Sequence, residues 1–272
     1  TVTVNDKATG KVNITVNGTS HIVDIVNGKA TLVLSGLGAA DYTVTVSYAG
    51  DGNFTAATAS AVFNVAKISA DMTVAVDNIT YGNNATITVN ANNRVNGKVN
   101  VTVNGATYEV EIVNGKGTLV LSGLAAGSYT VTVSYNGDAN FNSATASAAF
   151  NVAKANPGMN VGVLTFDYGT KVNVTVTVND KATGSVSISL DGMSGVSVAI
   201  VNGKATYTFV GITNGTHTIT VNYAGDRNFT GDSKTVDFSA GSGDASLTVT
   251  VGNITYGNNA TIVVTVNPTA TG

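Results

Sequence analysis

Residues 107–122 read Thr-Tyr-Glu-Val-Glu-Ile-Val-Asn-Gly-Lys-Gly-Thr-Leu-Val-Leu-Ser, and in them an Asn-Gly pair separates two runs of alternating apolar and polar side chains. Alternation with a period of two is typical of half-buried β-strands. Asn114 and Gly115 can supply the two positive φ angles that a type I′ hairpin turn requires. The stretch therefore predicts two strands joined by a tight turn. Asn104 and Gly105 predict a second such turn one strand earlier.

Two phrases of the sequence recur at a nearly constant spacing. Val-Asn-Gly-Lys starts at Val26, Val113 and Val201, and Tyr-Xaa-Gly-Asp-Xaa-Asn-Phe starts at Tyr48, Tyr135 and Tyr223. The first phrase returns after 87 residues and then after 88. A period of that length holds a whole small domain, whereas short solenoid repeats run at roughly 20 to 50 residues. We therefore expect copies of one domain at 1–67, 68–154, 155–242 and 243–272.

The alternating pattern predicts seven strands in the second copy. They cover residues 72–78, 85–89, 98–103, 107–113, 117–122, 128–135 and 145–152. Seven short strands are the number found in a constant-type immunoglobulin-like sandwich, in which two sheets bury Val, Ile and Leu between them. The sequence therefore predicts an all-β chain of tandem, seven-stranded immunoglobulin-like sandwiches arranged end to end.

Aromatic side chains recur at fixed places in the predicted strands and loops. We expect six of them to fill the cores, namely Phe54, Phe63, Phe141, Phe150, Phe229 and Phe238. Tyr42 and Tyr129 begin the sixth strand, where a tyrosine hydroxyl typically bonds back to the preceding loop. His217 takes this place in the third copy.

The first and last copies are incomplete. Residues 1–67 lack an opening strand, and 243–272 supply only an opening. Thr1–Gly10 (TVTVNDKATG) aligns with Val263–Gly272 (VVTVNPTATG), so the two ends repeat the same ten residues of a copy. This overlap favours a window from a longer array. Head-to-tail donation of strands between chains is the alternative, because both ends present unpaired strand edges.

The composition excludes several classes of protein. Charged residues form 11% of the chain, compared with about 25% in ordinary soluble domains. The net charge is −3 and no run of Lys or Arg occurs, which argues against nucleic acid as a partner. The absence of cysteine excludes disulfides and thiolate metal sites. No apolar run approaches the roughly 18 residues of a membrane span, so we expect none in this segment.

Residues that could carry catalysis do not recur between copies. His21 and His217 lie at non-equivalent places, so the copies share no set of histidine, carboxylate and nucleophile. Glu109 and Glu111 lie two residues apart on one predicted strand and therefore on one face. We interpret them as an exposed edge rather than an acid–base pair. The sequence thus predicts no enzymatic activity and no cofactor.

One acidic feature does recur, in a Gly-Asp-Xaa-Asn loop before the last strand of each copy. Its aspartates are Asp51, Asp138 and Asp226. We expect an Asx-turn, in which the carboxylate accepts hydrogen bonds from backbone N–H groups of the loop. Calcium is the weaker alternative, because Ca²⁺ takes six to eight oxygen ligands and each loop offers one carboxylate.

Sequons for asparagine-linked glycosylation are dense in this chain. Each is weak alone, because a sequence so rich in Asn and Thr forms many by chance. We expect several to carry glycans, which would also keep a surface poor in charge soluble. The candidates are Asn13, Asn17, Asn53, Asn78, Asn84, Asn100, Asn173, Asn214, Asn228, Asn253 and Asn259.

The order of these motifs resembles a known family. An opening strand ending in Tyr81-Gly82, an Asn-Gly-Lys-Ala-Thr turn at 27–31, Leu-Ala-Ala-Gly-Ser-Tyr at 124–129 and the closing Tyr-Xaa-Gly-Asp-Xaa-Asn-Phe are similar to bacterial immunoglobulin-like repeats of group 3. Most similar are Asn- and Thr-rich, adhesin-like surface proteins of methanogenic archaea. The resemblance implies an immunoglobulin-like sandwich, an extracellular cell-surface location and a role in adhesion or as a spacer. It implies no catalytic residues.

We therefore expect a non-catalytic structural repeat of a prokaryotic, archaeal cell-surface fibre, adhesin or stalk that extends a binding head. Its expected partners are neighbouring immunoglobulin-like repeats or copies of itself. One alternative is a subunit of an extracellular filament polymerised by strand complementation. Another is a module that binds host or cell-surface glycans or proteins, which exposed, coplanar Tyr81, Tyr168 and Tyr256 would favour.

Overall fold

The computed structural model describes residues 1–166, 171–241 and 247–266, and these residues form strands, turns and loops without a helix. The chain divides into two compact units. The first comprises Thr1–Asn78, Asn84–Ser122 and Ser128–Asn151, and the second comprises Ile79–Asn83, Gly123–Gly127 and Val152–Gly272. The second unit thus contains the third copy and the residues after it, together with three short segments of the second copy.

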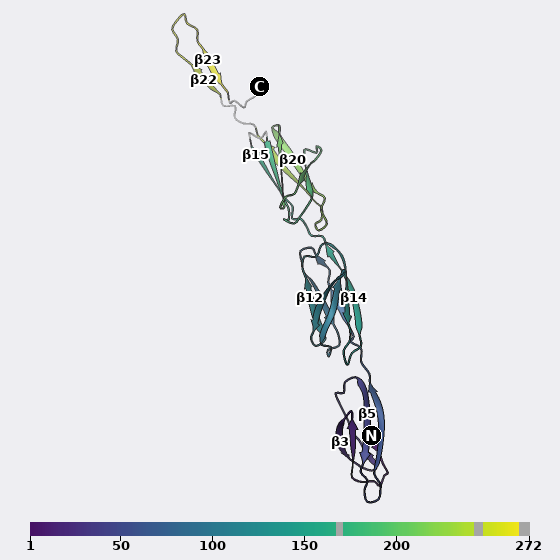
Figure 1. Ribbon diagram of the computed structural model, residues 1–272. Helices are drawn as coiled ribbons and strands as arrows, with labels where there is room; N and C mark the ends of the chain where they lie inside the picture. Colours follow the sequence, from purple (N-terminus) through teal and green to yellow (C-terminus); the bar gives the residue numbers. More distant parts are fainter. Residues whose placement is uncertain (167–170, 242–246, 267–272) are drawn as a thin grey trace. The chain divides into compact units, whose positions relative to one another are not determined.

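The second copy has the complete set of strands (Figure 1). They are β7 (Thr73–Val76), β8 (Ile79–Thr80), β9 (Ala85–Asn90), β10 (Gly97–Val103), β11 (Ala106–Ile112), β12 (Lys116–Leu121), β13 (Gly127–Tyr135) and β14 (Ala144–Ala153). One sheet has the order β12-β9-β7 and the other β11-β10-β13-β14-β8. β9 pairs antiparallel with β7 and β12, and β10 pairs antiparallel with β11 and β13. β14 pairs with β8 in parallel.

The opening strand of the second copy differs from the prediction, because it is divided between the two sheets. β7 pairs with β9, at Val74 opposite Val89, and β8 then pairs with the end of β14 in the other sheet. Asn78 lies at this crossing, where its side-chain oxygen accepts a hydrogen bond of 2.7 Å from the N–H of Asn151. The fourth predicted strand corresponds to β11, which pairs with β10. The two sheets therefore have three and five strands, unlike the four and three of a constant-type domain.

The third copy also has two sheets, with three and four strands among its described residues. Its strands are β15 (Asn160–Phe166), β16 (Lys171–Thr177), β17 (Ser185–Leu190), β18 (Val196–Ala199), β19 (Lys204–Val210), β20 (Gly215–Tyr223) and β21 (Asp232–Ala240). The sheet orders are β15-β16-β19 and β18-β17-β20-β21. Asp167, Tyr168 and Gly169, which the sequence places in the opening turn of this copy, lie outside the described residues.

The two predicted Asn-Gly turns of the second copy are present, but they connect strands in different ways. Asn104 and Gly105 have φ angles of 43° and 90° and join β10 to β11 in one hairpin. Asn114 and Gly115 have φ angles of 51° and 76°, yet only Val113 and Lys116 bridge across them. β11 and β12 then continue in opposite sheets, so the predicted hairpin is a connection between sheets. A β-carbon added to Gly115 would lie 2.5 Å from the carbonyl oxygen of Asn92, so only glycine fits at this position without a shift of the backbone.

Alternation along the strands places Val and Ile between the two sheets. In the second copy Val101 lies opposite Val133 across β10 and β13, and both side chains are fully buried. Ile87 and Val89 face them from β9 and are also fully buried. The third copy has the same kind of core, in which Val174, Ile188 and other side chains are closed from solvent. The predicted all-β sandwich is therefore confirmed.

The first copy is built from fewer strands. They are β1 (Val2–Thr3), β2 (Lys11–Val16), β3 (Thr19–Asp24), β4 (Lys29–Ala30), β5 (Ala40–Tyr48) and β6 (Ala57–Val65). β3-β2-β5-β6 form one sheet, but the other holds only the two-residue pairing of β1 with β4. In the second copy the strand that corresponds to β4 is β12, and it pairs with β9 over six residues. The strand after the Asn-Gly-Lys turn thus shortens where its partner is short.

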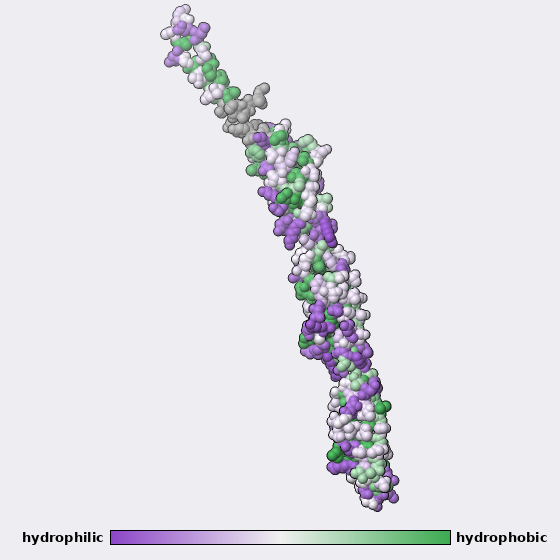
Figure 2. All heavy atoms as spheres, viewed as in Figure 1, coloured by the Kyte–Doolittle hydropathy of each residue, from purple (hydrophilic) through white to green (hydrophobic). Residues whose placement is uncertain are grey.

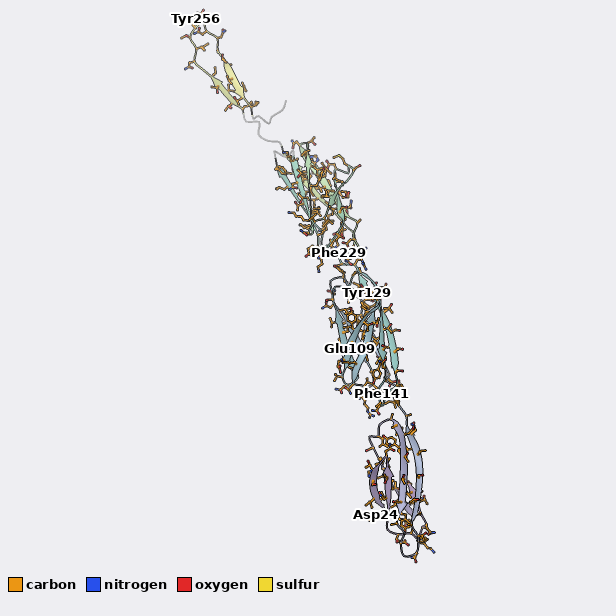
Figure 3. All side chains as sticks on the ribbon, in the orientation of Figure 1. Asp24, Glu109, Tyr129, Phe141, Phe229 and Tyr256 are labelled. Carbon is orange, nitrogen blue, oxygen red and sulfur yellow. The ribbon has the colours of Figure 1, made fainter. Side chains whose placement is uncertain are left out.

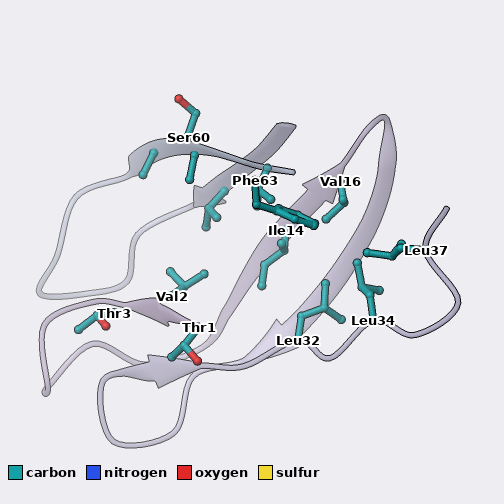
Figure 4. A pocket seen from close by; sticks show the side chains of 14 residues that line it. Thr1, Val2, Thr3, Ile14, Val16, Leu32, Leu34, Leu37, Ser60 and Phe63 are labelled. Atoms are coloured by element: carbon teal, nitrogen blue, oxygen red, sulfur yellow. The ribbon is translucent and has the colours of Figure 1, made fainter. Parts of the chain in front are cut away.

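An open apolar groove of about 560 Å³ lies over the inner face of the first copy. Ile14, Leu32, Leu34 and Phe63 line it (Figure 4). The prediction that Phe63 fills a core is therefore wrong, since its side chain is 39% exposed, whereas the equivalent Phe150 is 3% exposed. The difference arises because opening strands cover this face only in the later copies.

Residues after the third copy form a separate hairpin of two strands, β22 (Thr248–Val251) and β23 (Ile262–Thr265). They correspond in sequence to the opening strands of the second and third copies. All their side chains are exposed, and Figure 2 shows apolar and polar residues together at the surface of this hairpin. The part of the predicted overlap at residues 267–272 lies outside the described residues.

The two equivalent phenylalanines give a direct test of what the opening strands contribute. Phe150 stacks on Tyr129 at 5.2 Å and Phe63 on Tyr42 at 5.1 Å, so the aromatic pairing is the same and burial differs. We expect Phe150→Ala to destabilise the second copy by about 3–5 kcal/mol, as usual for buried phenylalanine, and Phe63→Ala to destabilise the first copy less. Amide hydrogen exchange in β13 and β14, compared with β5 and β6, measures both losses. Equal losses of stability would contradict the inference that the opening strands stabilise a copy by burying this phenylalanine.

Candidate functional site

The Gly-Asp-Xaa-Asn loop of the third copy is organised by one carboxylate. Asp226 Oδ1 accepts hydrogen bonds from the N–H groups of Asn228 and Phe229, at 2.7 and 2.8 Å. Its Oδ2 accepts two more from Thr183, one from the backbone N–H at 2.8 Å and one from the hydroxyl at 2.9 Å. Burial alone would raise the pKa of Asp226, but these N–H donors outweigh it and lower the pKa to about 2.

The first copy repeats this arrangement with Asp51. Its Oδ1 accepts from the N–H groups of Asn53 and Phe54, and its Oδ2 accepts from the backbone and the hydroxyl of Thr9, all between 2.8 and 3.0 Å. Hydrogen bonds from the backbone of Asn53 and Thr9 hold the pKa of this carboxyl well below its usual range. The tyrosine that starts the loop motif, Tyr48, donates its hydroxyl to the carbonyl of Thr9 at 3.1 Å.

The second copy keeps one half of the arrangement. Asp138 Oδ1 accepts from the N–H groups of Asn140 and Phe141 at 2.7 and 2.8 Å. Asn96 stands where the other copies have threonine, and its amide oxygen instead accepts from the N–H of Asn114 at 2.9 Å. Burial raises the pKa of Tyr135, the tyrosine of this motif, to about 12. The Asx-turn prediction is confirmed in all three copies.

The carboxylates of these loops are engaged by N–H and O–H donors rather than grouped with other acidic side chains. Within the described ranges, no group of three or more His, Cys, Asp and Glu side chains could hold a metal ion. Calcium at Asp51, Asp138 or Asp226 was the weaker alternative from the sequence and stays untested. A cation there would compete with the backbone donors for the same oxygens.

In the first copy the corner before the sixth strand follows the tyrosine prediction. The hydroxyl of Tyr42 donates to the carbonyl of Gly38 at 3.0 Å. In the third copy His217 makes the equivalent contact, with its Nε2 at 2.8 Å from the carbonyl oxygen of Thr213. The histidine thus replaces the tyrosine at the corner and preserves the bond to the carbonyl four residues earlier.

His217 also has a charged partner. Its Nδ1 lies 2.7 Å from Oδ2 of Asp191, and its ring stacks on Phe238 at 5.5 Å. Both ring nitrogens therefore face acceptors, and only the imidazolium has two N–H donors. The hydrogen bond with Asp191, followed by that with Thr213, raises the pKa of His217. Asp237 on the neighbouring strand is occupied by the hydroxyl of Thr218 at 2.7 Å.

The two glutamates have the surroundings expected of an exposed edge. β11 is the edge strand of its sheet, and both Glu109 and Glu111 are exposed on it. Glu109, labelled in Figure 3, forms an ion pair of 2.6 Å with Lys98 on β10. His21 lies on β3 of another copy. The structure thus brings together no acid–base pair from these residues.

The candidate glycosylation sites differ in exposure, although their occupancy stays a prediction. Asn13 and Asn173 lie on β2 and β16, half-buried, with their amide oxygens closed from solvent. Asn228 is half-buried in its loop. The remaining candidates are exposed, namely Asn17, Asn53, Asn78, Asn84, Asn100, Asn214, Asn253 and Asn259.

The tyrosines that would favour a binding module do not share one environment. The ring of Tyr81 is half-buried and packs edge-on against Phe229, with centroids 5.3 Å apart. Tyr256 is fully exposed at the loop of the β22–β23 hairpin (Figure 3). Tyr168 lies outside the described residues. These contacts give no support to a row of equivalent aromatic platforms.

Sequence reasoning missed a second role of the same loop. The side-chain oxygen of Asn140 accepts a hydrogen bond of 2.9 Å from the N–H of Ala39, and that of Asn228 accepts one of 3.0 Å from the N–H of Ala126. Each bond links a loop to the copy before it. The only available signal was that asparagine recurs in the loop together with aspartate.

The imidazolium of His217 makes the stability of the third copy depend on pH. A raised folded-state pKa adds stability that is fully present below the unfolded value of about 6.5 and is lost as the pH rises through the folded value. We expect His217→Tyr, which restores the residue of the other copies, to remove this dependence. Urea unfolding followed by amide signals of β20 and β21, at pH 5.5 and at higher pH, tests it. A pH dependence that survives the substitution would sink the assignment.

Comparisons with known proteins give two kinds of result. Solved structures that match the chain include fibronectin(III)-like modules of Clostridium thermocellum CbhA, at 15% identity, with 62% of this chain and 94% of that chain covered and a TM-score of 0.27. The FN1-FN3 domains of chicken CNTN1 match at 13% identity, with 87% and 91% covered and a TM-score of 0.25. No curated protein matches the chain.

The sequence profile of one protein family matches two stretches, residues 72–153 and 160–241. The first stretch runs from the opening strand to β14 of the second copy, and the second from β15 to β21 of the third copy. Together they cover more than half of the 272 residues. The chain therefore belongs to the bacterial Ig-like domain family, group 3.

Proposed function

We propose that this chain is a non-catalytic structural repeat of a prokaryotic, archaeal cell-surface fibre, adhesin or stalk that extends a binding head from the cell. The observation that carries the proposal is the repetition of one sandwich with one loop hydrogen-bond pattern. Asp51 and Asp226 bind the same four kinds of donor although 175 residues separate them (226 − 51). The recurring feature is thus a set of hydrogen bonds that stabilises the loop and the fold.

The family supports the non-catalytic part of this proposal. Tandem immunoglobulin-like domains suggest a structural or surface module, and such domains are generally non-catalytic. In repeat proteins the length grows with the number of copies while each copy contacts only its neighbours. An array of this kind serves as a spacer without any chemistry of its own.

The family also supports a place outside the cell. Bacterial Ig-like domains are usually extracellular or surface-exposed. In the described ranges no helix is both long and apolar enough to cross a membrane. The archaeal source and the adhesin context rest on the resemblance of the Asn- and Thr-rich sequence, and they are part of the proposal.

One observation favours the alternative of a filament polymerised by strand complementation. The groove over Leu32, Leu34 and Phe63 is open, and the exposed β22–β23 hairpin corresponds to the strands that cover this face in the other copies. A hairpin from one chain would fit the groove of another by adding strands to its sheet edge. A module for host or cell-surface glycans or proteins has no comparable support.

Electron cryo-microscopy of native material separates these functions. A surface fibre is expected to show continuous density through the joins, with an axial rise of about 35 to 45 Å per copy, as strands of about eight residues and their loops require. Chain breaks every three copies, each bridged by a borrowed hairpin, would establish the filament alternative. Recovery of the protein only from the cytosol, with no fibre, would overturn both.

A second prediction concerns the glycans of the native protein. Asn84 and Asn259 occupy equivalent exposed loops, so we expect glycans there. Asn13 and Asn173 have buried amide oxygens on strands and are expected to remain unmodified. Mass spectrometry of peptides from native material measures the occupancy of each site. An intact mass equal to that of the sequence would refute glycosylation altogether.

A further inference from the structure

We infer that the asparagine of the Gly-Asp-Xaa-Asn loop couples each copy to the copy before it. Asn140 reaches from the second copy to the N–H of Ala39 in the first, 101 residues earlier, and Asn228 reaches from the third copy to the N–H of Ala126 in the second, 102 residues earlier. We call these two residues the coupling asparagines. The same contact thus occurs at both places where one copy follows another within the described residues.

The aspartate of the loop sets the position of each coupling asparagine. Asp138 binds the backbone N–H of Asn140 at 2.7 Å, and Asp226 binds that of Asn228 at 2.7 Å. The backbone of the asparagine is therefore fixed within its own copy while its side chain is directed outward to the neighbour. In this motif the aspartate carboxylate therefore makes its contacts inside its own copy, and the asparagine side chain contacts the preceding copy.

A lysine on the connecting segment also donates a hydrogen bond to the loop. Lys67 Nζ donates to the carbonyl oxygen of Asp138 at 2.6 Å, and Lys154 Nζ donates to that of Asp226 at 2.5 Å. The residue after each lysine forms a parallel bridge with the phenylalanine of the loop, Ile68 with Phe141 and Ala155 with Phe229. The connection and the loop are thus tied by both side-chain and main-chain hydrogen bonds.

The first coupling asparagine, Asn140, leaves space open beside its contact with the first copy. A groove of about 340 Å³ remains beside it, lined by residues such as Leu37, Ala66 and Arg94. Gly38 lies against the asparagine, since an added β-carbon would come 3.1 Å from Asn140 Oδ1. The hydrogen bond of Asn140 with Ala39 and that of Lys67 with Asp138 link the two copies beside this groove. Next to the second coupling asparagine, the packing of Tyr81 on Phe229 adds one ring contact.

The partner that this loop accepts is the connection and corner loop of a neighbouring immunoglobulin-like copy. The recognised group is a backbone N–H, so the side chain at that position matters little. The lysine of the connecting segment, by contrast, contributes a side-chain hydrogen bond. The third copy has Gly241 after its closing strand, where the first two copies have Lys67 and Lys154. These contacts lie within the chain, so the coupling holds whether or not the fibre proposal is correct.

The first copy supplies a matched control for the test. Asn53 occupies the same loop position and has its backbone held by Asp51 at 2.8 Å, but its side chain makes no hydrogen bond to another copy among the described residues. The variants are therefore Asn140→Ala, Asn228→Ala and Asn53→Ala, each in the full 272-residue chain. Asn140→Asp keeps an acceptor oxygen and serves as the conservative variant.

Residual dipolar couplings of backbone amides report whether neighbouring copies tumble as one body. In the unmodified chain we expect neighbouring copies to share one alignment tensor. Asn140→Ala is expected to give the first copy its own tensor, and Asn228→Ala the third copy, whereas Asn53→Ala and Asn140→Asp leave the couplings unchanged. Unchanged amide exchange within each copy will show that the sandwiches remain folded. The inference is overturned if Asn140→Ala leaves the tensors shared, or if Asn53→Ala separates them equally.

Discussion

Each copy depends on one constraint, which is that a sheet with Val and Ile on a single side is stable only when a second sheet covers that side. The second copy satisfies it with β7, β9 and β12, which close over Val101 and Val133. In the first copy the short pairing of β1 with β4 leaves part of the face open. Apolar burial supplies most of the stability of a small domain. The extent of the second sheet therefore determines how stable a copy is.

Features that depend on neighbouring residues in the sequence were predictable. The positive φ angles of Asn104 and Gly105 are a local property of that pair, and so is the Asx-turn at Asp226. The corner at Tyr42 follows from the same reasoning, because its acceptor lies four residues away. Strand positions were also close to the prediction, since alternation directly reports which side faces the core.

Features that depend on distant partners were not predictable. The opening strand crosses between sheets because β8 pairs with β14, and nothing in the two residues of β8, which lie beyond the predicted strand at 72–78, indicates that partner. The exposure of Phe63 depends on strands that do not lie over it, while its own sequence context matches that of Phe150. The contact of Asn140 escaped prediction because its donor is a main-chain N–H, which every residue except proline possesses.

The use of a main-chain N–H as the donor affects how a gene for such repeats can change. A contact with a main-chain N–H carries no information about which copy supplies it, and Ala39 and Ala126 serve equally. Unequal recombination between the repeated segments can therefore add or delete a whole copy without requiring compensating substitutions at this contact. Divergence within a copy, as in the exchange of tyrosine for histidine at position 217, likewise leaves the boundary untouched. Array length and the sequence of individual copies can thus evolve independently.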